Sequence, residues 1–411
     1  MAGYFYLIFI SSFFTEYYNF WKLIGVPAQH LLFGDLRIVL SGFECTKLGY
    51  DVLLENPCNP FEQPNHGAIF YPRIWMALAP LGLEQSQTIF LGLVFTLLFY
   101  IVAIIMIGRL NYYEATVYAL IFCSPPLMLL VERDNPDIIL FLLLAISLTI
   151  VSKSSRLVYR VIAYATILFT AILKLYPIFG LIVVFREKRK VCILLLASLI
   201  TPFLIYSFSH LEELKTIARE APNTAWYSYG YKVIFDELIN YFSSPYIVAS
   251  KKAILNLVFG VAVGLVSCVL GCKLAVKVFQ EFNAWLIHKF QLKNKLGQLD
   301  NERLNNFRLG SSLYVGTFLI GSIYDYKLVF LLFVIPQILA DINSKNKLGL
   351  PSSIASIGII ATLYLSPFSR FSLGEIISWF LLGDFLYSLS ITLPDWIKFR
   401  IYSSSSKLGA K

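Results

Sequence analysis

Long uninterrupted apolar runs constrain the fold of this chain more than any other feature. Residues 88–108 read "TIFLGLVFTLLFYIVAIIMIG", and comparable runs occupy 253–272 and 373–393. Roughly 18 to 20 apolar residues in a helix cross the hydrocarbon core of a bilayer. Of the 411 residues, 57% are hydrophobic and only 14% are charged, which is too little polar surface for a soluble protein of this size. We therefore expect an all-α polytopic membrane protein.

The hydropathy pattern predicts a bundle of about 12 transmembrane helices in a single domain. No internal repeat is visible, and no separate soluble domain is expected. Short amphipathic helices in two outer loops should roof a cavity lined by spans two to six and nine to ten. The expected spans are 3–20, 86–108, 114–131, 135–151, 158–173, 175–186, 190–208, 250–273, 307–323, 326–342, 351–368 and 373–393.

The distribution of Lys and Arg predicts which loops face the cytoplasm. One set of alternate loops is rich in these residues, including "REKRK" at 186–190 and the long basic segment within 274–306. The positive-inside rule places this set, both termini and the tail 394–411 in the cytoplasm. The loops 21–85 and 209–249 then lie on the outer face. The net charge of +9 is scattered among these loops, which favours a topological role over nucleic-acid binding.

The N-terminus and the cysteines complete this picture. The first 21 residues lack a basic start and a cleavage site, so we expect no removable signal peptide. Cys45 and Cys58 share one polar outer loop, and a disulfide between them would require an oxidising compartment. The histidines are too scattered to form a metal-ligand set, although a divalent metal stays open as a cofactor.

Ionisable residues concentrate at the outer ends of the apolar runs, where polar groups are expensive unless they face a cavity or a partner. A structural interpretation exists for each one, as a helix cap, an internal ion pair or a lysine that extends to the headgroups. Together they indicate a lined polar site. The four clusters carry Asp35 and Arg37; Glu132, Arg133, Asn135 and Asp137; Lys174 and Tyr176; and Tyr324, Asp325 and Lys327.

The chemistry of these clusters suggests a base and an anion site. Asp35 precedes an apolar stretch, so a partly desolvated carboxylate there is suited to proton abstraction. Arg133, Lys174 and Lys327 carry the charges that bind a phosphate. The aromatic stretch 223–231 is able to stack on a sugar ring, or to anchor the chain at the interface.

The order of these motifs resembles the GT-C superfamily of glycosyltransferases. The similarity is strongest to glycosyltransferase family 87, the polyprenol-phosphate-mannose-dependent mannosyltransferases. It spans most of residues 30–335 and rests on motifs that are individually weak. These motifs are Asp35, "LGYDVL" at 48–53, "FYPRIW" at 70–75, "ERDNPD" at 132–137, "KLYP" at 174–177 and "YDYKLVFLL" at 324–332.

The resemblance implies a reaction and roles for residues. Such enzymes pass a sugar from a polyprenyl-phosphate donor to a lipid or glycan acceptor on the outer face, with inversion at the anomeric carbon. Asp35 matches the general base, and Arg133 and Lys174 match candidates for the donor phosphate. The family usually reads "ERGN" and "YPP", whereas this chain has Asp134 and Arg73 at the variable positions. Arg73 would add a further cation to the substrate site.

Two other functions are compatible with the sequence. A transporter or flippase for a lipid-linked or anionic substrate would also need charged residues in an apolar chain. Transporters often show two related halves and polar sites at mid-membrane, and this sequence has neither feature. A non-catalytic scaffold subunit is the third candidate. We expect a multi-pass protein, and favour a bacterial inner membrane over the endoplasmic reticulum.

Overall fold

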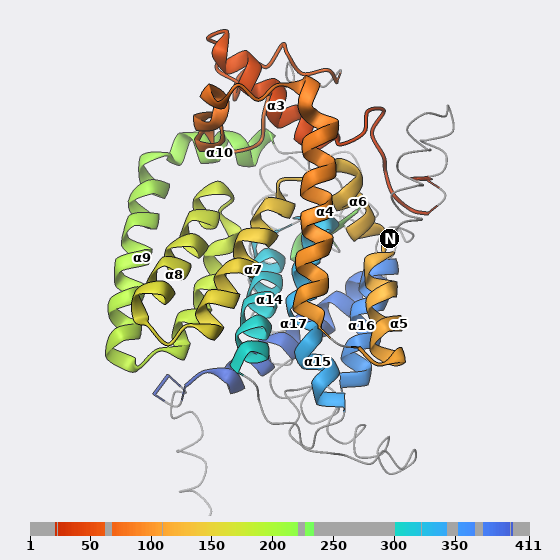
Figure 1. The fold of residues 1–411 in the computed structure, drawn as a ribbon, viewed down its shortest axis with the longest axis vertical. Helices are drawn as coiled ribbons and strands as arrows, with labels where there is room; N and C mark the ends of the chain where they lie inside the picture. Colours follow the sequence, from red (N-terminus) through yellow and green to blue (C-terminus); the bar gives the residue numbers. More distant parts are fainter. Residues whose placement is uncertain are drawn as a thin grey trace, which may run out of the picture.

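The computed structural model describes residues 21–22, 24–61, 68–108, 110–220, 227–233, 301–321, 323–342, 352–365, 373–394 and 396–397. The described chain is mostly helical, with one two-stranded antiparallel pair. Figure 1 shows most of the helices running along the long axis of the molecule. The predicted all-α class is therefore confirmed.

The helices and strands follow one another in this order: α3 (Gly34–Lys47), η2 (Arg73–Leu81), η3 (Gln85–Gln87), α4 (Thr88–Ile107), α5 (Tyr112–Phe122), α6 (Pro125–Arg133), α7 (Asp137–Lys153), α8 (Leu157–Leu173), η4 (Tyr176–Arg186), α9 (Arg189–Ser209), α10 (Leu211–Glu220), β1 (Ser228–Tyr229), α14 (Asn301–Ile320), β2 (Ile323–Tyr324), η6 (Asp325–Phe333), α15 (Ile335–Ile342), α16 (Ser352–Leu365) and α17 (Leu373–Thr392). The segments labelled η are 3₁₀-helices.

The predicted spans largely coincide with these helices. Spans 3–20 and 250–273 lie outside the described residues, as does most of the cytoplasmic loop and the tail. Two described helical stretches, Gln85–Ile107 and Arg189–Ser209, are long and apolar enough to cross a membrane. A third crossing is possible if α5 and α6 form one bent span. The helix positions are confirmed, whereas a full set of 12 crossings stays a prediction.

The break between α5 and α6 follows from the sequence. Asn111 and Glu114 form a capping box at the start of α5, with both hydrogen bonds at 2.9 Å. Pro125 and Pro126 then occupy the first positions of α6, where a missing N–H costs little. Because proline cannot continue the preceding helix, the two axes meet at 54°.

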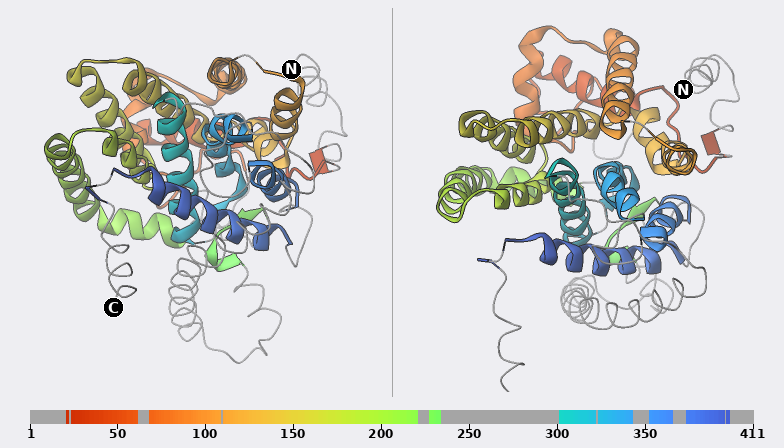
Figure 2. Two further views of the ribbon diagram at one scale, coloured as in Figure 1. Left: turned by 90° about the horizontal axis from the view of Figure 1, so that it is seen from below. Right: turned by 60° about the horizontal axis from the view of Figure 1, so that its bottom comes forward.

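Helix α14 lies at the centre of the described bundle. Its residues from Asn305 to Phe318 are buried on every side, as expected of a helix enclosed by protein. It packs on η4, α17, η6 and α7. Gly310 permits close packing on η6, since a Cβ there would lie 2.8 Å from the carbonyl oxygen of Phe330. Figure 2 shows α14 to α17, in cyan to dark blue, gathered on one side of the bundle.

The described parts of the two predicted outer loops include α3, η2 and α10, which lie at one end of the molecule. Figure 1 shows α3 and α10 together at the upper end, where α4 begins and α9 ends. The expected helix in the second outer loop is confirmed as α10. The Glu213 carboxylate of α10 accepts a hydrogen bond of 2.7 Å from the backbone N–H of Arg73, at the start of η2. A carboxylate at a helix N-terminus is favourable, so α10 holds η2 in place.

A disulfide links Cys45, near the end of α3, to Cys58 in the following loop. The open question from the sequence is thus resolved in favour of pairing. Gln85 strengthens this corner, because its side chain donates to the Cys58 carbonyl at 3.0 Å and to the Glu44 carboxylate at 2.6 Å. The bond fixes the end of α3 to the loop that leads back toward α4.

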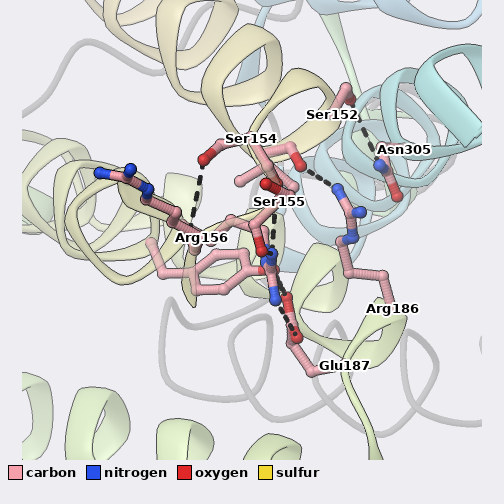
Figure 3. Close-up of polar contacts among 10 residues, drawn as sticks. Ser152, Ser154, Ser155, Arg156, Arg186, Glu187 and Asn305 are labelled. Carbon is pink, nitrogen blue, oxygen red and sulfur yellow. Dashed lines mark hydrogen bonds and ion pairs between the residues drawn. The ribbon is translucent and has the colours of Figure 1, made fainter. Parts of the chain in front are cut away.

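A separate polar network joins α7, α8, η4 and α14 around the α7–α8 loop (Figure 3). Arg160 donates hydrogen bonds to both carboxylate oxygens of Glu187, at 2.7 and 3.0 Å, and Tyr164 donates to the same carboxylate at 2.8 Å. Arg186 donates to the Val151 carbonyl, close to the end of α7. A cation at a helix C-terminus complements the helix dipole. These hydrogen bonds fix the positions of the α7–α8 loop and of the basic segment after η4 relative to each other.

Candidate active site

Four segments that are distant in sequence bring most of the predicted polar residues together. They are the start of α3, the turn between α6 and α7, the break between α8 and η4, and the start of η6. Hydrogen bonds or ring contacts connect all four. Tyr71, from the loop before η2, joins them through Asn135 and Lys174. We call the connected residues Asp35, Tyr71, Arg133, Asn135, Asp137, Lys174, Tyr176, Tyr326 and Lys327 the polar cluster.

The backbone before α3 fixes the position of Asp35. Phe33 has the left-handed conformation, with φ 58° and ψ 46°, and its N–H donates to the Glu132 carbonyl at 3.0 Å. Gly92 of α4 has no side chain that would collide with the Phe33 ring. Asp35 therefore enters the first turn of α3, where the helix dipole favours a carboxylate, with 8% of its surface exposed.

Two neighbours on the α6–α7 turn contact the Asp35 carboxylate. Nδ2 of Asn135 donates to Oδ2 at 2.5 Å, and Nη1 of Arg133 lies 3.9 Å from Oδ1. Arg133 is anchored from behind, because its Nη2 donates to the carbonyl of Pro27 at 3.1 Å. The predicted base thus lies beside an amide donor and a cation.

Asn135 connects the base to the second half of the cluster. Its Nδ2 also lies 3.4 Å from the hydroxyl of Tyr71, and its Oδ1 accepts from the ammonium of Lys174 at 3.0 Å. The same oxygen accepts the backbone N–H of Asp137 at 3.0 Å, which caps the start of α7. Because both ends of the amide are used, its orientation is fixed by the surrounding contacts.

Lys174 lies at the helix break that the "KLYP" motif predicts. Helix α8 ends at Leu173, and the backbone of Lys174 is extended. The next helix, η4, begins at Tyr176 and has Pro177 in its first turn. The Lys174 ammonium is 2.6 Å from Oδ1 of Asp137. Tyr176 donates to the same oxygen at 2.9 Å. Both contacts reach Oδ1, whereas Oδ2 of Asp137 is buried and makes no hydrogen bond.

Aromatic rings form the walls around the two lysines. The Lys174 ammonium lies 5.0 Å from the centre of the Tyr71 ring and 5.8 Å from that of Tyr326. The Lys327 ammonium lies 4.9 Å from the centre of the Tyr176 ring, within cation–π range. In the described part of the chain, no carboxylate lies within ion-pair distance of Lys327. Lys327 is therefore the cation available for an anionic ligand.

Backbone strain adjoins the cluster. Within the described ranges, the non-glycine residues with positive φ are Phe33, Asp134 and Tyr227. Phe33 precedes Asp35, Asp134 lies between Arg133 and Asn135, and the Tyr227 carbonyl accepts the N–H of Asp325 at 2.8 Å. Left-handed conformations are costly for residues with a Cβ and concentrate at functional sites.

The structure places three predicted site residues differently. Arg73 lies outside the cluster, with its guanidinium 2.5 Å from Asp51 and 3.8 Å from Glu213. Arg37 is half-buried, and no hydrogen bond or ion pair joins it to the cluster among the described residues. Glu132 is fully buried and accepts from the backbone N–H of Gln29 at 3.2 Å, so it holds the loop before α3.

The two remaining predicted residues lie at the edge of the cluster. Asp325 is 1% exposed and starts η6. The Tyr324 ring stacks on Tyr326, with ring centres 5.5 Å apart. Tyr324 also belongs to β2, which pairs with β1 through Ser228. The strand pair therefore anchors the segment that presents Tyr326 and Lys327.

Sequence reasoning missed Tyr71 and Tyr326. Both occur inside quoted motifs, "FYPRIW" and "YDYKLVFLL", and the signal was their position within two residues of a charged residue. Burial and the nearby Asp35 carboxylate raise the pKa of Tyr71 well above its usual value, so this phenol stays protonated. Trp75 of η2 was also missed, and its Nε1 donates to the Leu173 carbonyl at 3.1 Å, beside Lys174.

The donor set does not resemble a metal site. Within the described residues, no three His, Cys, Asp or Glu side chains converge closely enough to hold an ion. The arrangement offers a buried carboxylate, a hydrogen-bonded amide and three cations, of which Lys174 and Lys327 lie against aromatic rings. These groups are suited to remove a proton and to bind a negative charge.

The fold and the site define a helical protein with apolar helices able to span a membrane and a buried polar cluster near one end of the bundle. Comparison with known protein families, characterised proteins and solved structures finds no match.

Proposed function

We propose that this protein is a membrane-embedded inverting glycosyltransferase. It moves a hexose such as mannose from a polyprenyl-phosphate donor to a lipid or glycan acceptor on the outer face. In this proposal the chain resides in a bacterial inner membrane with both termini in the cytoplasm. The observation that supports this proposal most strongly is the placement of the buried Asp35 carboxylate beside Arg133 and its connection through Asn135 to Lys174. Lys327 lies near Lys174 and, within the described residues, has no carboxylate at ion-pair distance.

Asp35 would act as the general base. It removes the proton from an acceptor hydroxyl as the oxygen attacks the anomeric carbon of the donor. The new glycosidic bond forms on one face of the sugar while the bond to phosphate breaks on the other. The proton ends on Asp35, and polyprenyl phosphate leaves. A positioned base typically contributes about 10²- to 10⁴-fold to the rate.

The cations would stabilise the departing phosphate. Negative charge grows on the phosphate as the glycosyl bond breaks, and fixed cations in a poorly hydrated site favour that state. Lys174 is already paired with Asp137 at 2.6 Å, so Lys327 and Arg133 are the stronger candidates for phosphate contact. Tyr71 and Tyr326 would pack against the ligand between them.

The surroundings suit a lipid-linked donor. The apolar helices would pack against the isoprenoid chain of the donor, and the adjacent polar cluster would bind its phosphate. The Cys45–Cys58 disulfide is at the predicted outer end, and disulfides persist in oxidising compartments. This agrees with chemistry on the outer side of the membrane.

The decisive experiment measures sugar transfer by the purified protein in lipid nanodiscs. Labelled polyprenyl-phosphate mannose and glucose serve as donors, and methyl hexosides serve as acceptors. We expect transfer by the wild type and loss of transfer by Asp35→Asn, with Glu55→Gln as a control in the same outer loop. Transfer by Asp35→Asn at the wild-type rate would exclude this base. No transfer by a folded wild type, with donor movement across proteoliposomes instead, would support the transporter alternative.

A further inference from the structure

Asp134 is a buried carboxyl group without a partner. It is 3% exposed, and both side-chain oxygens are shielded from solvent and make no hydrogen bond. It lies on the α6–α7 turn, directly between Arg133 and Asn135, the two residues that contact Asp35. A buried polar group that makes no hydrogen bond is unfavourable.

The backbone at Asp134 is also unfavourable for this residue. Its φ of 44° and ψ of 53° are left-handed, at the position that ends α6. Glycine is preferred there because it has no Cβ, and aspartate is merely tolerated. Both the side chain and the backbone of Asp134 therefore reduce the stability of the fold. A ligand that hydrogen-bonds to the carboxyl group would offset part of this cost.

The charge state of Asp134 limits which chemical groups of a ligand it can bind. Burial and the Asp35 carboxylate raise the pKa of Asp134 well above its usual value, which favours the protonated, neutral form of this group. A neutral carboxyl offers one O–H donor and one carbonyl acceptor. The negative charge of Asp35 also disfavours a phosphate at this position. A sugar hydroxyl, which both donates and accepts, matches these properties.

We propose that Asp134 binds a hydroxyl group of the sugar in this site and thereby determines which sugar is accepted. This inference rests on the proposed function and assigns a specificity residue to it. A site built to hydrogen-bond a hydroxyl rejects the analogue that lacks it, because the buried group would stay unpaired. The hydroxyl belongs either to the donor hexose or to the acceptor, and the experiment separates these two sources.

The test uses two variants, Asp134→Gly and Asp134→Asn. Glycine suits the left-handed backbone and removes the carboxyl group, so this variant should fold with an unchanged or higher Tm. Asparagine keeps a donor and an acceptor. For each variant, kcat/KM is measured with polyprenyl-phosphate mannose and glucose and with their monodeoxy analogues. The acceptor series consists of methyl hexosides and their monodeoxy analogues.

We expect Asp134→Gly to lose about 10- to 100-fold in kcat/KM for the preferred sugar. It should also lose the discrimination of the wild type against one particular deoxy analogue. Asp134→Asn should retain most of that discrimination. Loss confined to the donor series assigns the hydroxyl to the donor, and loss confined to the acceptor series assigns it to the acceptor. Unchanged discrimination in Asp134→Gly would overturn the inference.

A binding measurement separates this inference from the proposed function. The rise in Tm caused by methyl mannoside or methyl glucoside needs no turnover. If the wild type transfers no sugar but is stabilised by a hexoside, and Asp134→Gly is not, the inference stands and the transferase proposal fails. If transfer occurs and both proteins respond equally to every analogue, the transferase proposal stands and Asp134 has no role in recognition.

Discussion

Asn135 donates a hydrogen bond of 2.5 Å to Asp35 across 100 residues of sequence. Its other end accepts from Lys174 at 3.0 Å. One neutral amide thus joins the proposed base to the cationic half of the site, and neither charge has to approach the other directly.

Replacing Asn135 by leucine should reduce transfer, because Asp35 loses the amide that positions its carboxylate and Lys174 loses an acceptor. The unpaired groups should also lower the free energy of unfolding by about 1 to 3 kcal/mol. The measurements are kcat and the Tm in nanodiscs. A lower Tm with an unchanged kcat would reduce Asn135 to a structural role; Asn111→Ser, at the distant capping box, is the control.

Lys174→Met should destabilise the fold. It leaves the Asp137 carboxylate, whose side chain is 0% exposed, without its cation, and breaking a buried pair costs about 3 to 5 kcal/mol. The double variant Asp137→Asn/Lys174→Met should recover part of this loss, because no buried charge then stays unpaired. Denaturation in detergent would measure both. Equal stability of the single and double variants would contradict the importance of the pair.

In contrast to Lys174→Met, Lys327→Met should preserve the stability of the fold and weaken donor binding. Within the described residues Lys327 has no carboxylate at ion-pair distance, and the side chain is packed over the Tyr176 ring. Removing its charge should leave the Tm equal or higher while raising the KM for a polyprenyl-phosphate donor about tenfold or more, as expected for loss of a charge-assisted contact. Lys47→Met, at an exposed ion pair, is the matched control. An unchanged KM would remove Lys327 from the phosphate site.

Removing the disulfide should lower stability without abolishing the fold. The bonded cysteines are 13 residues apart, and closing a loop of this size contributes roughly 3 kcal/mol in the chain-entropy account. The variant Cys45→Ser/Cys58→Ser should therefore show a lower Tm than the oxidised wild type. Alkylation before and after reduction, read by mass, would verify the bond. Equal Tm values for the oxidised wild type and the Cys45→Ser/Cys58→Ser variant would contradict a stabilising contribution of the disulfide.

Glu187 predicts how stability responds to acid. Burial opposes its ionisation, but hydrogen bonds from Arg160 and Tyr164 outweigh burial and lower the pKa of Glu187 below its usual value of 4.5. The ionised group therefore stabilises the fold above that usual value, and this contribution disappears as the pH falls through the lowered value. The stability gap between the wild type and Glu187→Gln should shrink below about pH 4.5. A gap that is constant with pH would contradict this assignment.

Local sequence signals predicted much of the fold. The predicted span 114–131 ran through the "SPP" at 124–126, where the structure has the break before α6, whereas Pro177 marked the break after Lys174. Proline restricts helices through the backbone alone. The 3₁₀ geometry of η2, η4 and η6 was not predicted, since it depends on packing against α3, α14 and other distant elements. The left-handed Asp134 was flagged only as a departure from a glycine.

The candidate site was predictable in its residues but not in its connections. Charges in an apolar chain are expensive, so Asp35, Arg133 and Lys174 stood out. Sequence alone did not show that Arg73 pairs with Asp51 and Glu213, because Glu213 is 140 residues away. Nor did it reveal that one asparagine connects both halves of the cluster.

The attachment of η2 to α10 has a consequence for how the protein is made. Arg73 emerges from the ribosome long before Glu213, and Asp35 emerges 100 residues before Asn135. At a synthesis rate of about 5 to 20 residues per second, Asp35 waits roughly 5 to 20 s for its first partner. Lys327 and Tyr326 come later still. With the membrane insertion proposed above, the contacts of Asp35 and of the helices around it are complete only after η6, the last contributing segment, has been inserted.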